Sequence, residues 1–437
     1  MIEIKDMIED TCEKLQDLDR MENTMQNPSN KRVVLGQEVP WDKKSLCAGL
    51  PGISMAFSQL LAKDKSREDL AQMANRYLGK AVELFNQEGI LDFGLHNGLA
   101  GLGLGITSLA RTTGGYQNVL STINGALVDY APQLIRFVQE KAIVGYDVIS
   151  GAVGIVNYLF WHIEDDKVAE TIQNLIDALI HMCEPLEDGT VKYGWVVPPM
   201  YMFSEEEREK YPQGVFNSGY AHGIAGVLAL FAKAYQYGIC IPGQREAMER
   251  IVEYYMMYRF EEHGRYIWKG QMGLEEYLSI KAGETEPGDG DFFRRDAWCY
   301  GAPGICYSLL MASESLGDSE LRKMAMENMK SSLQIRDAIY APTFCHGYAG
   351  LLQLAKVAER QAGEEFLRKE KIELERLITT AYQPDTPFGF MDREYDTRSG
   401  VLRDYHEPGL LCGSTGILLA LLDDGRLVSV YQSAFGL

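Results

Sequence analysis

The sequence predicts an all-α chain folded as an α/α toroid, a double ring of seven inner and seven outer helices with a small β-containing insertion. Three observations support this prediction. A glycine motif occurs seven times, a short apolar segment follows each copy, and longer amphipathic segments precede the copies. Such self-similarity is typical of repeat folds, in which each unit buries its apolar face against its neighbours. Residues 1–437 are therefore expected to form a single domain.

The repeated motif is a pair of glycines three residues apart. Its first glycines are Gly49, Gly98, Gly151, Gly223, Gly301, Gly347 and Gly413. The segments that follow them are short, apolar on most sides and nearly uncharged, as is typical of helices buried all round. These segments are the predicted inner helices, and each is expected to begin at its glycine pair.

The segments between the motifs have the character of outer helices. In residues 66–85, 164–183 and 243–260, apolar side chains recur at helical spacing and the opposite face is charged. An open solenoid is the alternative to a closed ring, but its terminal repeats would need polar caps for solubility. Neither terminal pair in the sequence is polar in that way, so closure is favoured.

Two insertions interrupt the repeat, at about residues 186–216 and 261–294, as the wider spacing of copies three to five shows. They are rich in aromatic, β-branched and turn-forming residues, which is typical of short strands and loops. We expect them to form a lid or a small subdomain over one end of the ring.

Composition limits the partners and the compartment. With 42 basic and 62 acidic residues, the formal charge is −20, which argues against binding nucleic acid or an anionic membrane surface, although excess acid also serves solubility. The N-terminus lacks the pattern of a secretory signal, and no apolar stretch approaches the roughly 20 residues of a transmembrane helix. The chain is therefore expected to be cytoplasmic, with its eight cysteines reduced.

Potential metal ligands cluster just before the glycine pairs, at positions that should surround one mouth of the toroid. Three of the seven histidines and four of the eight cysteines occur there. The positions hold Cys47, His96, Asn97, His222, Cys299, Tyr300, Cys345, His346 and Cys412. This concentration predicts that the functional site lies at the mouth.

Copies five and six, neighbours in the predicted ring, carry Cys299, Cys345 and His346. Two thiolates and an imidazole suit one Zn²⁺ ion per chain, and three protein ligands leave the fourth tetrahedral position open for water or substrate. Copies seven and one would also meet on closure, so Cys412 and Cys47 form a rival pair without a third ligand.

A zinc ion with two thiolate ligands is a modest Lewis acid that suits another soft group, notably a substrate thiol bound as a nucleophilic thiolate. The pattern therefore predicts a thiol-alkylating reaction. Buried thiols can also act simply as small hydrophobes. That interpretation is expected for Cys306 and Cys240 rather than for the adjacent pair Cys345 and His346.

Four further residues are candidates for proton transfer and charge stabilisation. His222 has a ligand-like position without a neighbouring cysteine, so we expect an acid or base. A hydrogen-bonded core histidine is the alternative. Asp147 either orients His222 or caps a helix. Arg295 and Tyr300 flank Cys299, and each could donate hydrogen bonds to a developing oxyanion unless both are structural.

The motifs together resemble those of the lanthionine synthetase C-like cyclases. The matching stretches are DVISGAVG, NSGYAHGIAG, RRDAWCYGAPG, FCHGYAG and LLCGSTG. The resemblance covers roughly residues 45–420, the span of the repeats. It implies an α/α toroid with a small extra domain and one zinc. The implied reaction is a Michael-type addition, in which cysteine thiols of a ribosomal precursor peptide add to dehydroalanine or dehydrobutyrine and form lanthionine or methyllanthionine rings.

The resemblance also implies a role for each candidate residue. The implied zinc ligands are Cys299, Cys345 and His346. The implied proton-transfer residues are His222 and Asp147, and the residues implied to line the reacting centre are Arg295 and Tyr300.

The implied substrate is a dehydrated precursor peptide with its leader, and the insertions are the expected place of leader recognition. Because no dehydratase domain precedes the first helix pair, the chain is expected to be a stand-alone cyclase that relies on a separate dehydratase. A complex with this dehydratase and an exporter, peripheral to the inner face of the membrane, is the expected setting.

Two alternative functions stay open. Protein prenyltransferase β-subunits are also α/α toroids whose zinc activates a peptide thiol, but they use an Asp–Cys–His site and a partner subunit. The WCYG and CHG motifs disfavour them. Eukaryotic proteins that resemble the cyclases keep the zinc site and are associated with glutathione and signalling proteins, so the chain could instead bind or add small thiols in a signalling or adaptor role.

Overall fold

The structure is a computed structural model that describes residues 3–34, 37–186, 189–290, 292–395 and 400–437. These residues form two compact units. Unit 1 comprises Met1–Ile123, Ile339–Arg360 and Leu367–Ala434. Unit 2 comprises Asn124–Ala338, Gln361–Phe366 and Phe435–Leu437. Motif copies six, seven, one and two therefore belong to unit 1, and copies three to five belong to unit 2.

The inner helices of unit 1 each begin directly after the first glycine of a motif. They are α3 (Leu50–Lys63), α5 (Leu99–Thr113), α16 (Tyr348–Ala362) and α18 (Ser414–Leu422). The longer outer helices of unit 1 are α1 (Ile4–Leu15), which precedes α3, and α4 (Glu68–Glu88) and α17 (Arg368–Thr380), which follow α3 and α16. The shorter helices are α2 (Leu18–Gln26), the 3-10 turn η1 (Pro28–Asn30) and α19 (Val430–Ser433).

Unit 1 also holds two antiparallel hairpins. Strand β1 (Arg32–Val34) pairs with β2 (Gln37–Val39), and β7 (Asp392–Tyr395) pairs with β8 (Leu402–Tyr405). In the second hairpin Asp392 lies opposite Tyr405.

The inner helices of unit 2 follow the same rule. They are α8 (Ala152–Leu159), α11 (Ile224–Gln236) and α14 (Ala302–Leu316). The outer helices are α6 (Gln117–Gln139), whose first residues belong to unit 1, α9 (Asp166–Met182), α12 (Gln244–Met257) and α15 (Ser319–Ile335). The shorter helices are α7 (Ile143–Tyr146), η2 (Phe160–His162), η3 (Pro199–Tyr201), α10 (Glu205–Lys210) and α13 (Leu274–Lys281).

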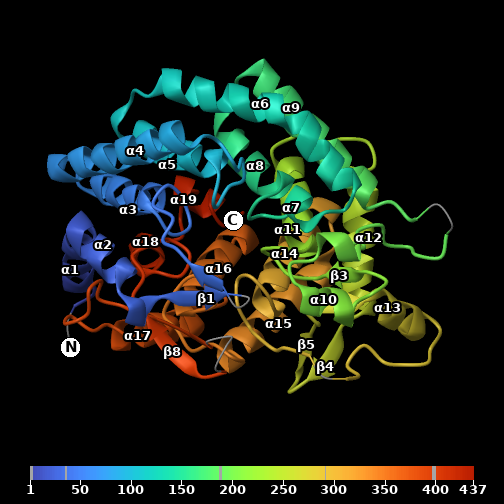
Figure 1. The fold of residues 1–437 in the computed structure, drawn as a ribbon. Helices are drawn as coiled ribbons and strands as arrows, with labels where there is room; N and C mark the ends of the chain where they lie inside the picture. Colours follow the sequence, from blue (N-terminus) through green and yellow to red (C-terminus); the bar gives the residue numbers. More distant parts are fainter. Residues whose placement is uncertain (1–2, 35–36, 187–188, 291, 396–399) are drawn as a thin grey trace. The chain divides into compact units, whose positions relative to one another are not determined.

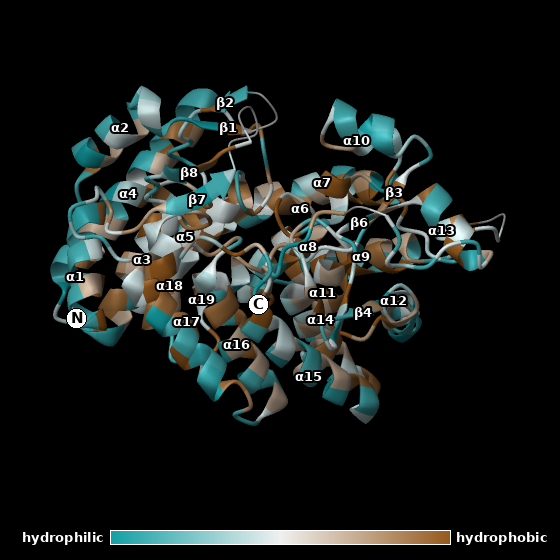
Figure 2. Ribbon diagram, turned by 90° about the horizontal axis from the view of Figure 1, so that it is seen from below, coloured by the Kyte–Doolittle hydropathy of each residue, from teal (hydrophilic) through white to brown (hydrophobic). Residues whose placement is uncertain are grey.

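Inner and outer helices alternate as the sequence predicts. The predicted outer segments at 66–85, 164–183 and 243–260 correspond to α4, α9 and α12. In unit 1, α4 lies along α3 and α5 (Figure 1), and in unit 2, α15 packs on α14. Hydrophobic residues are concentrated in inner helices such as α11 and α14, whereas α10 is largely hydrophilic (Figure 2). In the described part of the chain, no helix combines the length and the apolar character needed to cross a membrane.

Backbone hydrogen bonds join the loops before successive inner helices within each unit. In unit 1, Cys345 N donates to Leu411 O at 2.9 Å, and Leu411 N donates to Cys47 O at 2.9 Å. Cys47 N in turn donates to His96 O at 3.1 Å. Copies six, seven, one and two therefore lie side by side, and α18 of the last copy packs on α3 of the first. An open solenoid would keep its first and last repeats apart.

Unit 2 repeats this ladder with copies three to five. Val148 N donates to Ala221 O at 3.0 Å, and Ala221 N donates to Cys299 O at 3.1 Å. Within each unit, the residues before the glycine pairs therefore share one end of the inner helices, as the sequence predicts.

The two insertions meet in unit 2. Strand β3 (Val215–Asn217), at the end of the first, pairs antiparallel with β6 (Gln271–Gly273) of the second, with Val215 opposite Gly273. Strand β4 (Phe260–Glu262) forms a hairpin with β5 (Arg265–Ile267). A role as a lid stays a prediction, and residues 187–188 and 291 of the insertions lie outside the described residues.

The expectation of only strands and loops in the insertions is wrong at α10 and α13. Helix α10 has strong local signals: Ser204 accepts a hydrogen bond from Glu207 N at 3.1 Å, the first turn is acidic and the last turn is basic. A capping serine and charges that oppose the helix dipole both stabilise a short helix.

Close backbone approach explains the glycine pairs. Gly301 has φ of +100°, a region that residues with a Cβ rarely adopt. Three residues later, a Cβ on Gly304 would lie 2.5 Å from Trp298 O and 2.9 Å from the Cβ of Tyr220. The second glycine thus lets α14 approach both the loop before it and the loop before α11.

The contacts of Gly304 predict the effect of adding one methyl group. Gly304→Ala should lower the free energy of unfolding by about 1–3 kcal/mol, because neither a backbone oxygen nor a Cβ can swing away. Gly79→Ala, in outer helix α4, is the matched control, since nothing lies within 4 Å of its Cβ position. It should raise that free energy by about 0.4–1 kcal/mol. Urea unfolding measures both variants, and equal stability for Gly304→Ala and the wild type would contradict the account.

Candidate active site

In unit 2, His222 and Asp147 are directly hydrogen-bonded. His222 precedes α11, Asp147 precedes α8, and His222 Nδ1 lies 2.5 Å from Asp147 Oδ2. The other carboxylate oxygen, Oδ1, accepts from the backbone N–H groups of Ser150 and Gly151 at 2.7 and 2.8 Å. Asp147 therefore contacts His222 and also binds the backbone ahead of α8. It is not the N-cap of α8, because that position is Gly151 and no side chain caps it.

The surroundings of His222 favour its charged form. The Asp147 side chain is 1% exposed, whereas that of His222 is 28% exposed and keeps access to solvent. Desolvation alone would lower the pKa of His222, but the hydrogen bond and the negative charge of Asp147 outweigh it and raise the pKa above its usual value. The ring of Phe203 meets the imidazole edge-on at 5.0 Å between centroids. His222 is therefore an oriented imidazole able to hold a proton near neutral pH.

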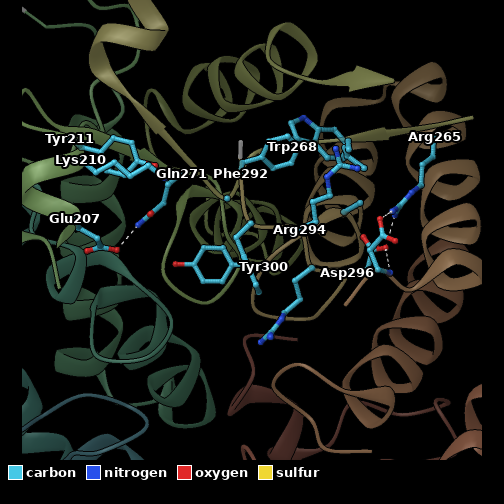
Figure 3. A pocket seen from close by; sticks show the side chains of 17 residues that line it. Glu207, Lys210, Tyr211, Arg265, Trp268, Gln271, Phe292, Arg294, Asp296 and Tyr300 are labelled. Atoms are coloured by element: carbon cyan, nitrogen blue, oxygen red, sulfur yellow. Dashed lines mark hydrogen bonds and ion pairs between the residues drawn. The ribbon is translucent and has the colours of Figure 1, made fainter. Parts of the chain in front are cut away.

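Tyr300 and Arg295 line one pocket of unit 2, with a volume of about 330 Å³ (Figure 3). The hydroxyl of Tyr300 accepts a hydrogen bond from Asn217 Nδ2 at 2.9 Å. Burial raises the pKa of Tyr300 above its usual value, so the hydroxyl keeps its proton and can donate it. The Arg295 guanidinium stacks over the ring of Phe293 at 4.9 Å.

Polar contacts between side chains also line the rest of this pocket. Gln271 Nε2 donates to Glu207 Oε1 at 2.8 Å on one side of Tyr300 (Figure 3). On the other side, Arg265 is 1% exposed and pairs with Asp296 and Asp337, each at 2.7 Å. The pocket therefore presents aromatic surfaces and hydrogen-bonding groups in a preformed shape.

In unit 1, Cys345 and His346 precede α16, and His346 lies beside two carboxylates of strand β7. His346 Nε2 is 3.2 Å from Glu394 Oε2 and 3.5 Å from Asp392 Oδ1. Asp392 is fully buried, and burial alone would raise its pKa. The charges of His346 and Arg32 outweigh burial and hold the pKa of Asp392 well below its usual range.

Among the residues that the structure describes, one group of side chains in unit 1 lies close enough together to hold a metal ion. Ligand atoms of His346, Asp392 and Cys412 all lie within 4.8 Å of one another. Of the predicted zinc ligands, Cys345 and His346 belong to unit 1 and Cys299 to unit 2. The predicted set therefore draws on both units and stays a prediction.

The rival cysteine pair lines a smaller cavity of unit 1. Cys47 and Cys412 both border a volume of about 160 Å³. Cys47 donates from Sγ to Asn97 Oδ1 at 3.1 Å, and burial raises the pKa of this thiol to about 12. A thiol with this pKa stays protonated at neutral pH and is a poor nucleophile.

Some sequence-based assignments are corrected or extended. Cys306 is buried, as expected, but Cys240 is exposed, because it lies in the turn between α11 and α12 and not in a helix. His96 is a buried histidine whose Nε2 lies 2.8 Å from Ala434 O. Sequence reasoning missed Asp392 and Glu394, although their spacing of two residues places both on one face of a strand.

Comparison with known proteins gives the family. The model of the family described as lanthionine synthetase C-like protein matches residues 40–424. The chain belongs to the lanthionine synthetase C-like family. The predicted assignment as a thioether-forming lanthionine synthetase is thereby confirmed.

Two further comparisons agree with the family. The Nisin biosynthesis protein NisC of Lactococcus lactis subsp. lactis is 27% identical over 354 residues, which cover 80% of this chain and 82% of NisC. Among solved structures, nisin cyclase matches with a TM-score of 0.79 and 23% identity over 98% of this chain and 97% of that one. Nisin cyclase is a helical toroid, so the predicted α/α toroid fold is confirmed.

The Asp147 contact in this lanthionine synthetase C-like chain predicts a measurable pKa change. Asp147→Asn removes the negative charge and should lower the pKa of His222 toward or below its usual value of about 6.5. In the wild type the pair stabilises the folded state fully below that usual pKa, and this stabilisation is lost as pH rises through the raised folded pKa. NMR titration of the His222 ring measures the shift, with the exposed His181 as internal control. An unchanged pKa in Asp147→Asn would contradict the pairing.

Proposed function

We propose that the chain is a zinc-dependent lanthipeptide cyclase that adds precursor-peptide cysteine thiols to dehydroalanine or dehydrobutyrine. The observation that carries this proposal is the His222–Asp147 pair, which supplies an oriented proton carrier in a family of lanthionine synthetases. A NisC relative at 27% identity supports a lanthipeptide as the substrate.

The donor set of Cys299, Cys345 and His346 fits zinc chemically. Two thiolates and one imidazole are preferred zinc ligands, and three of them leave one position open. The carboxylates beside His346 Nε2 also fit, because metal-bound histidines commonly donate their second ring N–H to a carboxylate. When bound, one zinc would supply the Lewis acidity that keeps a substrate thiol deprotonated at neutral pH.

The residues of unit 2 then account for the movement of protons. The thiolate sulfur forms a bond to the β-carbon of the dehydro residue while the carbon–carbon π bond breaks and its electrons pass to the enolate. His222, held by Asp147 at Nδ1, delivers a proton from Nε2 to the α-carbon, and the proton lost by the thiol balances the one gained. Tyr300 and Arg295 would donate hydrogen bonds to the enolate oxygen. The product has the mass of the substrate.

Substrate and partners follow from this chemistry. The pocket beside Tyr300 would receive part of the dehydrated precursor, and the inserted segments around β3 and β6 would bind its leader and act as a lid. The negative charge of −20 favours a cationic peptide. A dehydratase must supply the substrate, so a cytoplasmic complex with a dehydratase and an exporter, peripheral to the membrane, is part of the proposal.

The zinc ligands can be tested by metal analysis. Cys345→Ala should lose the bound zinc that the wild type retains, while the fold survives, because the inner helices bury a large apolar core that does not depend on a metal. Cys240→Ala, at an exposed thiol, is the matched control and should keep one zinc per chain. If Cys345→Ala keeps one zinc per chain, or if only Cys412→Ala loses zinc, the result would indicate that Cys412 and Cys47 bind the metal instead.

The role of His222 can be tested by cyclisation. His222→Asn should keep its zinc, while ring formation falls about a hundredfold to ten-thousandfold, the usual contribution of a positioned acid or base. Asp147→Asn should act in the same direction, and the double variant should lose much less than the product of the single losses.

The assay incubates the enzyme with a dehydrated precursor, caps the remaining thiols and measures peptide mass. His181→Asn, at an exposed histidine, is the control and should cyclise at the wild-type rate. Zinc loss in His222→Asn would indicate that His222 is a metal ligand. Cyclisation at the wild-type rate would indicate that His222 has only a structural role.

A further inference from the structure

We infer that Asp392 and Glu394 are positioning residues, whose carboxylates hold the His346 ring so that Nδ1 is the nitrogen presented to a metal. This inference rests on the proposed zinc function and deepens it. Its basis is the contact of His346 Nε2 with Glu394 Oε2 at 3.2 Å and with Asp392 Oδ1 at 3.5 Å, all within unit 1.

The strand geometry brings both carboxylates to one side. Successive side chains of a strand point to opposite faces, so Asp392 and Glu394 of β7 share a face and Arg393 points away. Arg393 instead forms an exposed ion pair with Asp404 of β8, with Nε and Oδ1 2.6 Å apart. The side chains on one face of the hairpin therefore lie beside His346, and those on the other face are exposed to solvent.

Asp392 is itself held in a fixed orientation. Thr343 Oγ1 donates to Asp392 Oδ1 at 2.7 Å, and Arg32 Nη2 donates to Oδ2 at 2.6 Å. Arg32 is anchored in turn by Glu407 Oε1 at 2.9 Å from its Nε and by the ring of Tyr405 at 4.5 Å. A carboxylate with partners on both oxygens cannot rotate freely, so the negative charge beside His346 Nε2 keeps a fixed position.

This arrangement selects one tautomer of His346. In a neutral imidazole, one nitrogen carries the proton and the other accepts or binds a metal. Carboxylates beside Nε2 favour the proton at Nε2 and leave Nδ1 as the basic nitrogen. Such outer partners fix the ring and raise its basicity, and their removal typically weakens metal binding about 10–100-fold.

A direct ligand role for Asp392 is the competing interpretation, because its oxygen, His346 and Cys412 form a compact group. The ion pair with Arg32 already neutralises the Asp392 carboxylate and favours a positioning role, and cobalt substitution distinguishes the two roles. Both of its oxygens already accept hydrogen bonds, from Thr343 and Arg32. A positioning role requires no change in the contacts that Asp392 makes with Thr343 and Arg32.

The test measures zinc affinity by chelator competition in the full chain. Asp392→Asn and Glu394→Gln should each bind zinc about 10–100-fold more weakly than the wild type. Asp404→Asn, which removes a carboxylate from the outer face of the same hairpin, should bind as the wild type does. The Glu394 side chain is 19% exposed, so Glu394→Gln should disturb folding less than a change at the buried Asp392. It therefore provides the test if Asp392→Asn does not fold.

Cobalt substitution separates a positioning role from direct ligation. The Co²⁺-loaded variants should keep the wild-type absorption bands, because the ligands are unchanged, and should lose cobalt more readily. Altered bands in Asp392→Asn would make Asp392 a ligand and overturn the inference, as would unchanged zinc affinity in both variants. A wild-type chain that binds no zinc would instead overturn the proposed function together with this inference.

Discussion

Close approach between backbone segments at the glycine pairs is the constraint on which the rest of the structure depends. At Gly304 the space for a side chain is already taken by the carbonyl oxygen of Trp298 and the Cβ of Tyr220. The same proximity allows the loops before the inner helices to hydrogen-bond in series within each unit. Those loops carry the candidate cysteines and histidines. The close approach at the glycine pairs therefore determines both how the inner helices pack and where these side chains lie.

Each unit also contains a histidine ring beside a carboxylate that other contacts hold in place. In unit 2, Asp147 accepts backbone N–H groups before α8 and contacts His222. In unit 1, Asp392 accepts from Thr343 and lies near His346. The same pairing serves two different roles in the proposed mechanism, since His222 would carry a proton and His346 would bind a metal through its other nitrogen.

The sequence predicts features that depend on local periodicity and misses those that depend on distant contacts. The seven inner helices follow from the glycine pairs, and the contact of Asp147 with His222, 75 residues apart, is foreseen because both precede a motif. Asp392 precedes no motif and reaches His346 only through the fold. Cys240 is predicted to be buried but is exposed, because it lies in the turn between α11 and α12.

Zinc-dependent ring formation on a peptide is tested most directly by removing and restoring the metal. The wild-type chain is stripped with a chelator, incubated with a dehydrated precursor with or without added zinc, and the remaining thiols are capped before mass measurement. With zinc, the peptide should lose capping sites while its uncapped mass is unchanged; without zinc, every thiol should still be capped. Equal ring formation under both conditions would contradict zinc dependence, and addition of glutathione without peptide rings would indicate a small-thiol function.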